Sequence, residues 1–260
     1  MAGTAPAQRP DDPLTTMLEV IAGDLSLLAG IQDRELAEAD LKALVEIGFP
    51  GCLGLSPDSA PGREAQALLA ELMRRIAEAG ADSALIDELA ADYADIYLNH
   101  SIQASPMESV WLDEDGLVMQ EPMFQVREWY QRYGLAAENW RVRPDDHLVL
   151  QLQFLAHLAQ NAPASEEAGE HLSEMARFMD EHLLRWIGQF AERVVARCGT
   201  PFYAGIAQLT AAYLEQLRDL LVELLGEPRP SAEEIEERMR PRRQVEEVPV
   251  KFMPGTAPTW

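Results

Sequence analysis

The chain has 260 residues, of which 47% are hydrophobic and 25% are charged, the composition of an ordinary folded soluble protein. Acidic residues outnumber basic ones by 44 to 21, which gives a formal net charge of −23 at pH 7. A field of this sign disfavours nucleic acid and anionic membranes as partners and favours a basic ligand or peptide. The two cysteines, Cys52 and Cys198, lie far apart in the sequence without a CxxC partner. We therefore expect reduced, partly buried thiols rather than a disulfide framework or a zinc site.

Residues 1–12 are small, polar and flanked by prolines, and we expect them to be disordered. They contain no apolar core of the kind that a secretory signal requires, and no uninterrupted run of about 18 apolar residues occurs anywhere. We therefore expect a cytoplasmic protein without a membrane span.

Apolar residues recur at helical spacing through the first half of the chain. The spacing predicts helices over residues 14–28, 36–45, 65–76 and 85–97. Gly80 ends the third of these, and Asp82 or Ser83 caps the fourth. Residues 99–120 then break the helical pattern, and long ordered loops in compact domains are often functional.

Helical patterns resume after this loop and continue almost to the end of the chain. They predict helices over residues 122–133, 146–160, 165–198 and 201–224, with a bend at Gly188. Ser231 and Glu234 fit a capping box for a short helix over 232–239, and the remainder of the tail looks extended or mobile. Because no alternating strand pattern occurs, we predict an all-α fold.

A polar segment with a proline, two aspartates and a histidine runs directly into the apolar helix predicted over residues 146–160. Pro144 suits a helix entrance, and Asp145 or Asp146 can cap the free amides of the first turn. That assignment leaves the other aspartate and His147 without an explanation. Their position favours two polar groups that face a cleft between two helical halves.

The sequence contains no phosphate loop, GxGxxG, HExxH, GxSxG or metal-spaced cysteine cluster. Asp146 and His147 could form an acid–base pair, but adjacent residues on a helix point in different directions. We therefore predict neither a catalytic nor a metal site, and no cofactor. The aromatic residues Trp111, Trp129 and Tyr130 fit core packing, while one or two of them could line a groove for an apolar peptide.

These segments together resemble the TorD/DmsD-type redox-enzyme maturation chaperones, whose hallmark is a Glu-Pro-x-Asp-His segment that opens an apolar helix. Residues 143–147 match this segment at Pro144, Asp146 and His147 but carry Arg143 in place of the glutamate. The family's Phe-x-x-x-His-Leu-x-x-Trp pattern is similar to residues 178–186. Further similarity lies in Pro106–Trp111, Glu121-Pro122 and Pro201-Phe202-Tyr203. The resemblance covers about residues 85–225.

The resemblance implies a cytosolic chaperone that binds the twin-arginine leader or the apo form of a molybdenum-cofactor oxidoreductase, assists cofactor insertion and prevents premature export. It assigns leader binding to Pro144, Asp146 and His147, with Asp146 as a candidate partner for an arginine of the leader. We add Trp111, Trp129 and Tyr130 as candidate groove residues.

The resemblance also implies a division into helical subdomains. These are residues 13–134 and 148–225, joined by a hinge at residues 135–147 and followed by a proline- and charge-rich tail over 226–260. The family's tendency to domain swapping implies a monomer or a domain-swapped homodimer.

Two alternatives remain open at this stage. One is an acidic helical subunit with a structural or assembly role in a redox complex. The other is a small helical enzyme that uses Asp146 and His147.

Overall fold

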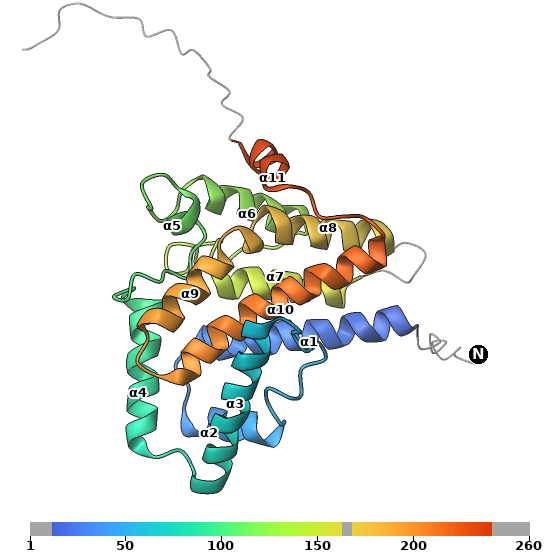
Figure 1. Cartoon of the computed structure of the whole chain (residues 1–260). Coiled ribbons are helices and arrows are strands. Elements are labelled where there is room, and N and C mark those ends of the chain that lie inside the picture. Colours follow the sequence, from blue (N-terminus) through green and yellow to red (C-terminus); the bar gives the residue numbers. More distant parts are fainter. Residues whose placement is uncertain (1–11, 163–167, 241–260) are drawn as a thin grey trace, which may run out of the picture.

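The structure is a computed structural model that describes residues 12–162 and 168–240, and these residues form helices without any strand. Figure 1 shows the arrangement. The helices are α1 (Pro13–Asp33), α2 (Glu38–Glu46), α3 (Ala60–Ala79), α4 (Ser83–Tyr93), α5 (Ser109–Leu112), α6 (Glu121–Arg132), α7 (Leu148–Gln160), α8 (Ala168–Glu181), α9 (Ile187–Arg197), α10 (Pro201–Leu225) and α11 (Ala232–Met239). A π-helical turn, η1 (Ala94–Leu98), and a 3-10 turn, η2 (Leu183–Arg185), connect some of them. The all-α prediction is confirmed.

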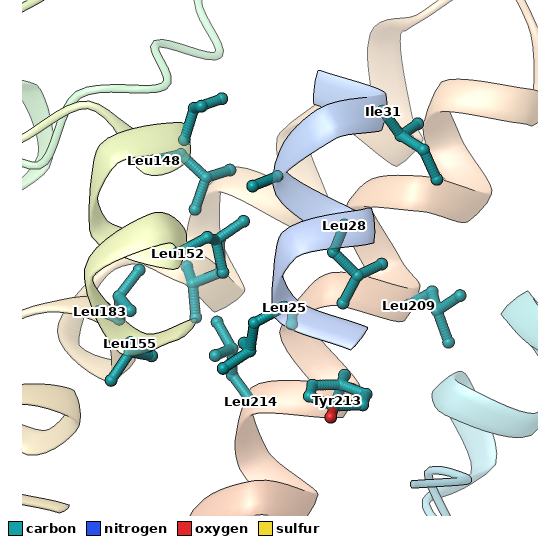
Figure 2. Close-up of a cluster of buried hydrophobic side chains, with 14 of the residues drawn as sticks. Leu25, Leu28, Ile31, Leu148, Leu152, Leu155, Leu183, Leu209, Tyr213 and Leu214 are labelled. Carbon is teal, nitrogen blue, oxygen red and sulfur yellow. The ribbon is translucent and has the colours of Figure 1, made fainter. Parts of the chain in front are cut away.

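The centre of the core lies where α1, α7 and α10 meet. Helix α1 packs along α7, and α10 packs against α3, α8 and α9. Figure 2 shows Leu25 of α1 beside Leu152 of α7 and Leu214 of α10, while Leu28 of α1 lies on the side of Leu209 of α10, and all of these side chains are fully buried. Because burial of one leucine side chain contributes about 1.5–3 kcal/mol, this contact is a main source of the bundle's stability.

Helix α1 is long and apolar enough to cross a membrane by length and composition, a test that buried core helices also pass. Here its apolar face packs on α7. Asp24 in its middle is buried and accepts hydrogen bonds from the Gly54 amide at 2.8 Å and the Tyr213 hydroxyl at 2.9 Å. These contacts are those of a helix in a bundle core.

The predicted helix over residues 165–198 is interrupted, and the prediction of a bend at Gly188 is wrong. The helix ends at Glu181, the turn η2 follows, and α9 begins at Ile187. His182 and Trp186 flank η2 with non-helical backbone angles, and both side chains are fully buried. Burial of these two large side chains therefore takes precedence over continuous helical hydrogen bonding.

Helices from both predicted subdomains contribute to one buried hydrophobic cluster, because α1 packs on α7 across the proposed boundary. The division at residues 135–147 stays a prediction. The expectations for residues 1–11 and 241–260 lie outside the described residues. Cys52 and Cys198 are both free, with Cys52 exposed and Cys198 half-buried.

Candidate functional site

Helix α7 begins at Leu148, two residues later than predicted, and its N-cap is His147. The His147 Nδ1 atom accepts a hydrogen bond from the Val149 amide at 3.2 Å. The prediction that Asp145 or Asp146 caps this helix is wrong, because both carboxylates bind groups elsewhere. Pro144 is buried four residues before the helix, and its carbonyl accepts a hydrogen bond from the His147 amide.

The segment before α7 is fastened to the loop that precedes α5. Met107 and His147 form an isolated antiparallel bridge. The Leu148 amide donates to the Pro106 carbonyl at 2.8 Å, and the Glu108 amide donates to the Asp146 carbonyl at 3.1 Å. The predicted long loop therefore contains a short helix whose entrance is attached to the Asp-His segment.

The Asp146 carboxylate completes this attachment. Its Oδ2 atom accepts a hydrogen bond from the Ser109 amide at 2.8 Å, and the side chain is fully buried. Its Oδ1 atom has no hydrogen-bond partner among the described residues. Burial raises the pKa of Asp146 to about 6, although the hydrogen bonds from Ser109 act in the opposite direction.

Glu108 is the centre of a buried polar network that joins three parts of the chain. Its Oε1 atom lies 2.9 Å from His182 Nδ1, and its Oε2 atom accepts from Gln151 Nε2 at 2.8 Å. The same Gln151 nitrogen donates to the Asp146 carbonyl at 3.0 Å. Glu108, Gln151 and His182 are all fully buried. The network therefore links the Asp-His segment to the break between α8 and α9.

Asp145 rather than Asp146 binds an arginine within the chain. Arg127 of α6 donates to Asp145 Oδ2 through Nε at 3.1 Å and through Nη2 at 2.8 Å. The Tyr130 hydroxyl donates to the Asp145 carbonyl at 2.9 Å. Both contacts anchor α6 to the segment before α7, while the pairing of Asp146 with a leader arginine stays a prediction.

The predicted aromatic residues lie in different surroundings. Trp129 and Tyr130 are buried in the core, where Trp129 packs edge-on against Phe178 and Tyr130 packs against Phe154. Trp111 is half-buried, and its indole nitrogen donates to the Ser105 carbonyl at 2.8 Å. The structure therefore places these three residues in separate contacts, and a groove for an apolar peptide lined by one or two of them stays a prediction.

His147 is expected to make the protein sensitive to mild acid. Burial lowers its pKa to about 3, with Arg143 and His100 acting in the same direction, whereas the unfolded value is about 6.5. The unfolded chain therefore binds a proton that the folded chain excludes, and stability is lost as pH falls from 6.5 towards 3. Between pH 7 and pH 5 the loss from this group should be about 2 kcal/mol.

Urea unfolding at pH 7 and pH 5 tests this expectation by comparing wild type with His147→Asn. Asparagine retains a side-chain oxygen that caps α7 but does not titrate. The contribution of Asp146, whose raised pKa has the opposite sign, is common to both proteins and cancels in the comparison. Equal losses of stability in both proteins would show that His147 is not the acid-sensitive group.

Sequence reasoning did not assign a peptide-binding role to Glu108, Ser109, Gln151 or His182. Gln151 carried the clearest signal, because it lies among buried leucines of α7 and a polar residue there needs a partner. Glu108 and His182 lay in segments that resembled the family, but their contact across 74 residues of sequence could not be inferred from spacing.

The arrangement does not resemble a catalytic or metal centre. Asp146 and His147 bind different backbone amides, at Ser109 and Val149. Within residues 12–162 and 168–240, no group of three histidine, cysteine, aspartate or glutamate side chains is placed to hold a metal ion. The described residues therefore form an all-helical bundle in which a buried polar network holds the Asp-His segment at the start of α7.

Comparison with known proteins identifies the family. The family model described as nitrate reductase delta subunit matches residues 57–192. The chaperone protein TorD of Vibrio cholerae serotype O1 is 33% identical over 205 residues, which cover 77% of this chain and 91% of that protein. TorD of Shewanella oneidensis is 31% identical over 212 residues, covering 77% of this chain and 89% of its own length. The chain belongs to this family of TorD-like chaperones, which are not enzymes, and the resemblance seen in the sequence is confirmed.

Proposed function

We propose that this protein is a cytoplasmic chaperone that binds the twin-arginine leader and the apo form of a molybdenum-cofactor oxidoreductase. Binding would assist cofactor insertion and prevent premature export. The observation that carries the proposal is the relationship to TorD chaperones over most of both chains. The net charge of −23 supports it, because a leader of this class begins with a basic segment.

An apolar pocket beside Tyr130 supports binding of the apolar segment that follows the two arginines. The pocket has a volume of about 260 Å³ and lies between residues 135–137 and one face of α7. Tyr130, Leu150 and Phe154 are among its apolar lining residues. Residues 135–137 belong to the proposed hinge, and Leu150 of the pocket follows the segment from Pro144 to His147 on α7.

Pro144, Asp146, His147 and Trp129 are buried in this structure. In the proposal they hold the pocket in shape, and Pro144, Asp146 and His147 contact the peptide directly only when the loop before α5 moves. Displacement of that loop would expose the Asp146 carboxylate, whose Oδ1 atom is unpartnered among the described residues. A guanidinium group is the natural partner for such a carboxylate.

The test is calorimetric titration with a synthetic leader peptide that contains two arginines followed by an apolar segment. Leu150→Gln should weaken binding about tenfold, since it places an amide in the apolar pocket. Val142→Gln is the matched control, because Val142 is 80% exposed and does not line the pocket. Asp146→Ala and His147→Ala should also weaken binding while the helical circular dichroism is retained. If both alanine variants bind the peptide normally, these residues act only in the structure and the peptide site lies elsewhere.

The description of the matching family model favours one other function, an assembly subunit of a redox complex. That function predicts a partner that co-purifies in fixed stoichiometry whether or not a leader is present. Light scattering on the purified protein would decide in the same preparation between a monomer and the domain-swapped dimer that the family implies.

A further inference from the structure

Helix α11 makes few contacts with the rest of the described chain. It packs against α8, and none of its side chains is buried. Arg185 pairs with Glu236 at 2.6 Å, and Gln125 Nε2 of α6 donates to the Met239 carbonyl at 3.1 Å. Figure 1 shows α11 lying beside α6 and α8, away from the core. A helix held in this way should open at a low free-energy cost.

The end of α11 covers a cleft between α6 and α8 with a volume of about 350 Å³. The body of the protein contributes three carboxylates to its lining, from Glu121, Glu128 and Glu181, against two guanidinium groups. Arg238 of α11 and Arg240, the residue after the helix, also line this cleft, and both side chains are exposed. Without α11 the lining therefore has an excess of negative charge, and the helix end supplies positive charge to it.

His182 contributes an unpaired hydrogen-bond acceptor to this cleft. Its Nδ1 atom bonds to the Glu108 carboxylate, which can only accept, so the proton of a neutral imidazole lies on Nδ1. The Nε2 atom is then an acceptor, and it has no partner among the described residues although the side chain is fully buried. A buried acceptor in this position needs a hydrogen-bond donor, which a guanidinium N–H can supply.

Trp129 supplies an aromatic face that already binds guanidinium groups. Arg132 lies 4.0 Å and Arg177 lies 5.4 Å from the centroid of a Trp129 ring. Arg177 also pairs with Glu181 at 2.6 Å. Carboxylates, an imidazole nitrogen that accepts and an indole face are groups that bind guanidinium, and the lining of this cleft contains all three.

We propose that the cleft between α6 and α8 binds an arginine-containing peptide segment, and that Arg238 and Arg240 of α11 occupy it as an internal competitor. The sequence places four arginines among residues 238–243 of a strongly acidic chain, which fits a segment that imitates a basic ligand. The inference rests on the proposed function, since the arginines of a leader are the external ligand that would displace α11. Binding of an incoming peptide then requires α11 to open, and the free energy of this opening lowers the apparent affinity of the peptide.

Fluorescence anisotropy with a labelled peptide that contains two consecutive arginines tests the inference on the full-length chain. Arg238→Ala/Arg240→Ala should tighten binding about threefold to tenfold, because the competitor is removed. Arg74→Ala/Arg75→Ala is the matched control, because it removes the same charge from exposed positions on α3 outside the cleft. Glu181→Gln should weaken binding severalfold, and circular dichroism establishes that each variant is folded.

Four results would overturn the inference, and the last of them would also reject the proposed function. Equal tightening by both arginine pairs would show that only the overall charge matters, and no tightening by either pair would show that α11 does not compete. Binding that is unchanged by Glu181→Gln would place the arginines elsewhere while leaving the proposed function intact. Failure of the peptide to bind any of the proteins would instead reject the proposed function and the cleft together.

Discussion

Replacement of Glu108 by alanine is expected to lower the free energy of unfolding by about 3–5 kcal/mol. The carboxylate is fully buried and bonds to both His182 and Gln151. Its removal leaves two buried polar side chains without their partner and opens a small cavity, and each of these effects costs about 1–3 kcal/mol. Within this network, Glu108 is the side chain that joins the loop before α5 both to α7 and to the break between α8 and α9.

Urea denaturation followed by circular dichroism measures the effect of Glu108→Ala. Glu114→Ala is the control, since it makes the same truncation at an exposed position of the loop and should change stability by less than about 0.5 kcal/mol. Glu108→Gln keeps an acceptor for His182 and should cost less than the alanine variant. A loss below about 1 kcal/mol for Glu108→Ala would contradict the proposed importance of the network.

The ion pair between Asp180 of α8 and Arg218 of α10 should show a similar loss when one partner is removed. Arg218 donates to the two carboxylate oxygens at 2.9 and 2.8 Å, and the two side chains are only 4% and 7% exposed. Arg218→Met leaves Asp180 as an uncompensated buried charge, so we expect a loss of about 3–5 kcal/mol. The pair connects the two helices beneath α11 and so supports that side of the bundle.

The double variant Asp180→Leu/Arg218→Met separates charge burial from loss of packing. Since an apolar pair of similar size replaces a buried ion pair at little cost, the double variant should recover most of the stability lost in Arg218→Met. Thermal unfolding of the wild type, Arg218→Met and the double variant at the same pH compares their stabilities. Additive losses in the double variant would mean that Asp180 and Arg218 contribute independently.

The fold could be predicted from the sequence because helical spacing, glycine stops and the capping box are local signals. Ser231 and Glu234 form the predicted capping box, with hydrogen bonds of 3.2 and 2.7 Å. The break after Glu181 was missed, since it depends on burial of His182 and Trp186 against segments distant in sequence. Local periodicity carries no information about such contacts.

The candidate site was predicted only in part for the same reason. The sequence singled out Asp146 and His147, but it could not show that one binds the Ser109 amide and the other caps α7. Neither aspartate caps α7. Asp145 instead pairs with Arg127, and Asp146 accepts a hydrogen bond from the Ser109 amide. Those partners come from the loop before α5 and from α6, and only the fold brings them together.

The network connects the two regions in which we propose peptide binding. Glu108 touches His182, which lines the cleft beneath α11, and Gln151, which bonds to the Asp146 carbonyl. A peptide that draws His182 towards its arginine would therefore act on the same carboxylate that holds the start of α7. Leader binding and movement of the loop before α5 are linked in this account.

The most direct test of the chaperone function is a pull-down of the tagged protein from anaerobically grown cells of its source, with the captured polypeptides identified by mass spectrometry. The account predicts recovery of a molybdoenzyme precursor that still carries its twin-arginine leader, and reduced recovery with Leu150→Gln but not with Val142→Gln. Recovery of mature or unrelated proteins alone, without any leader-bearing precursor, would contradict it.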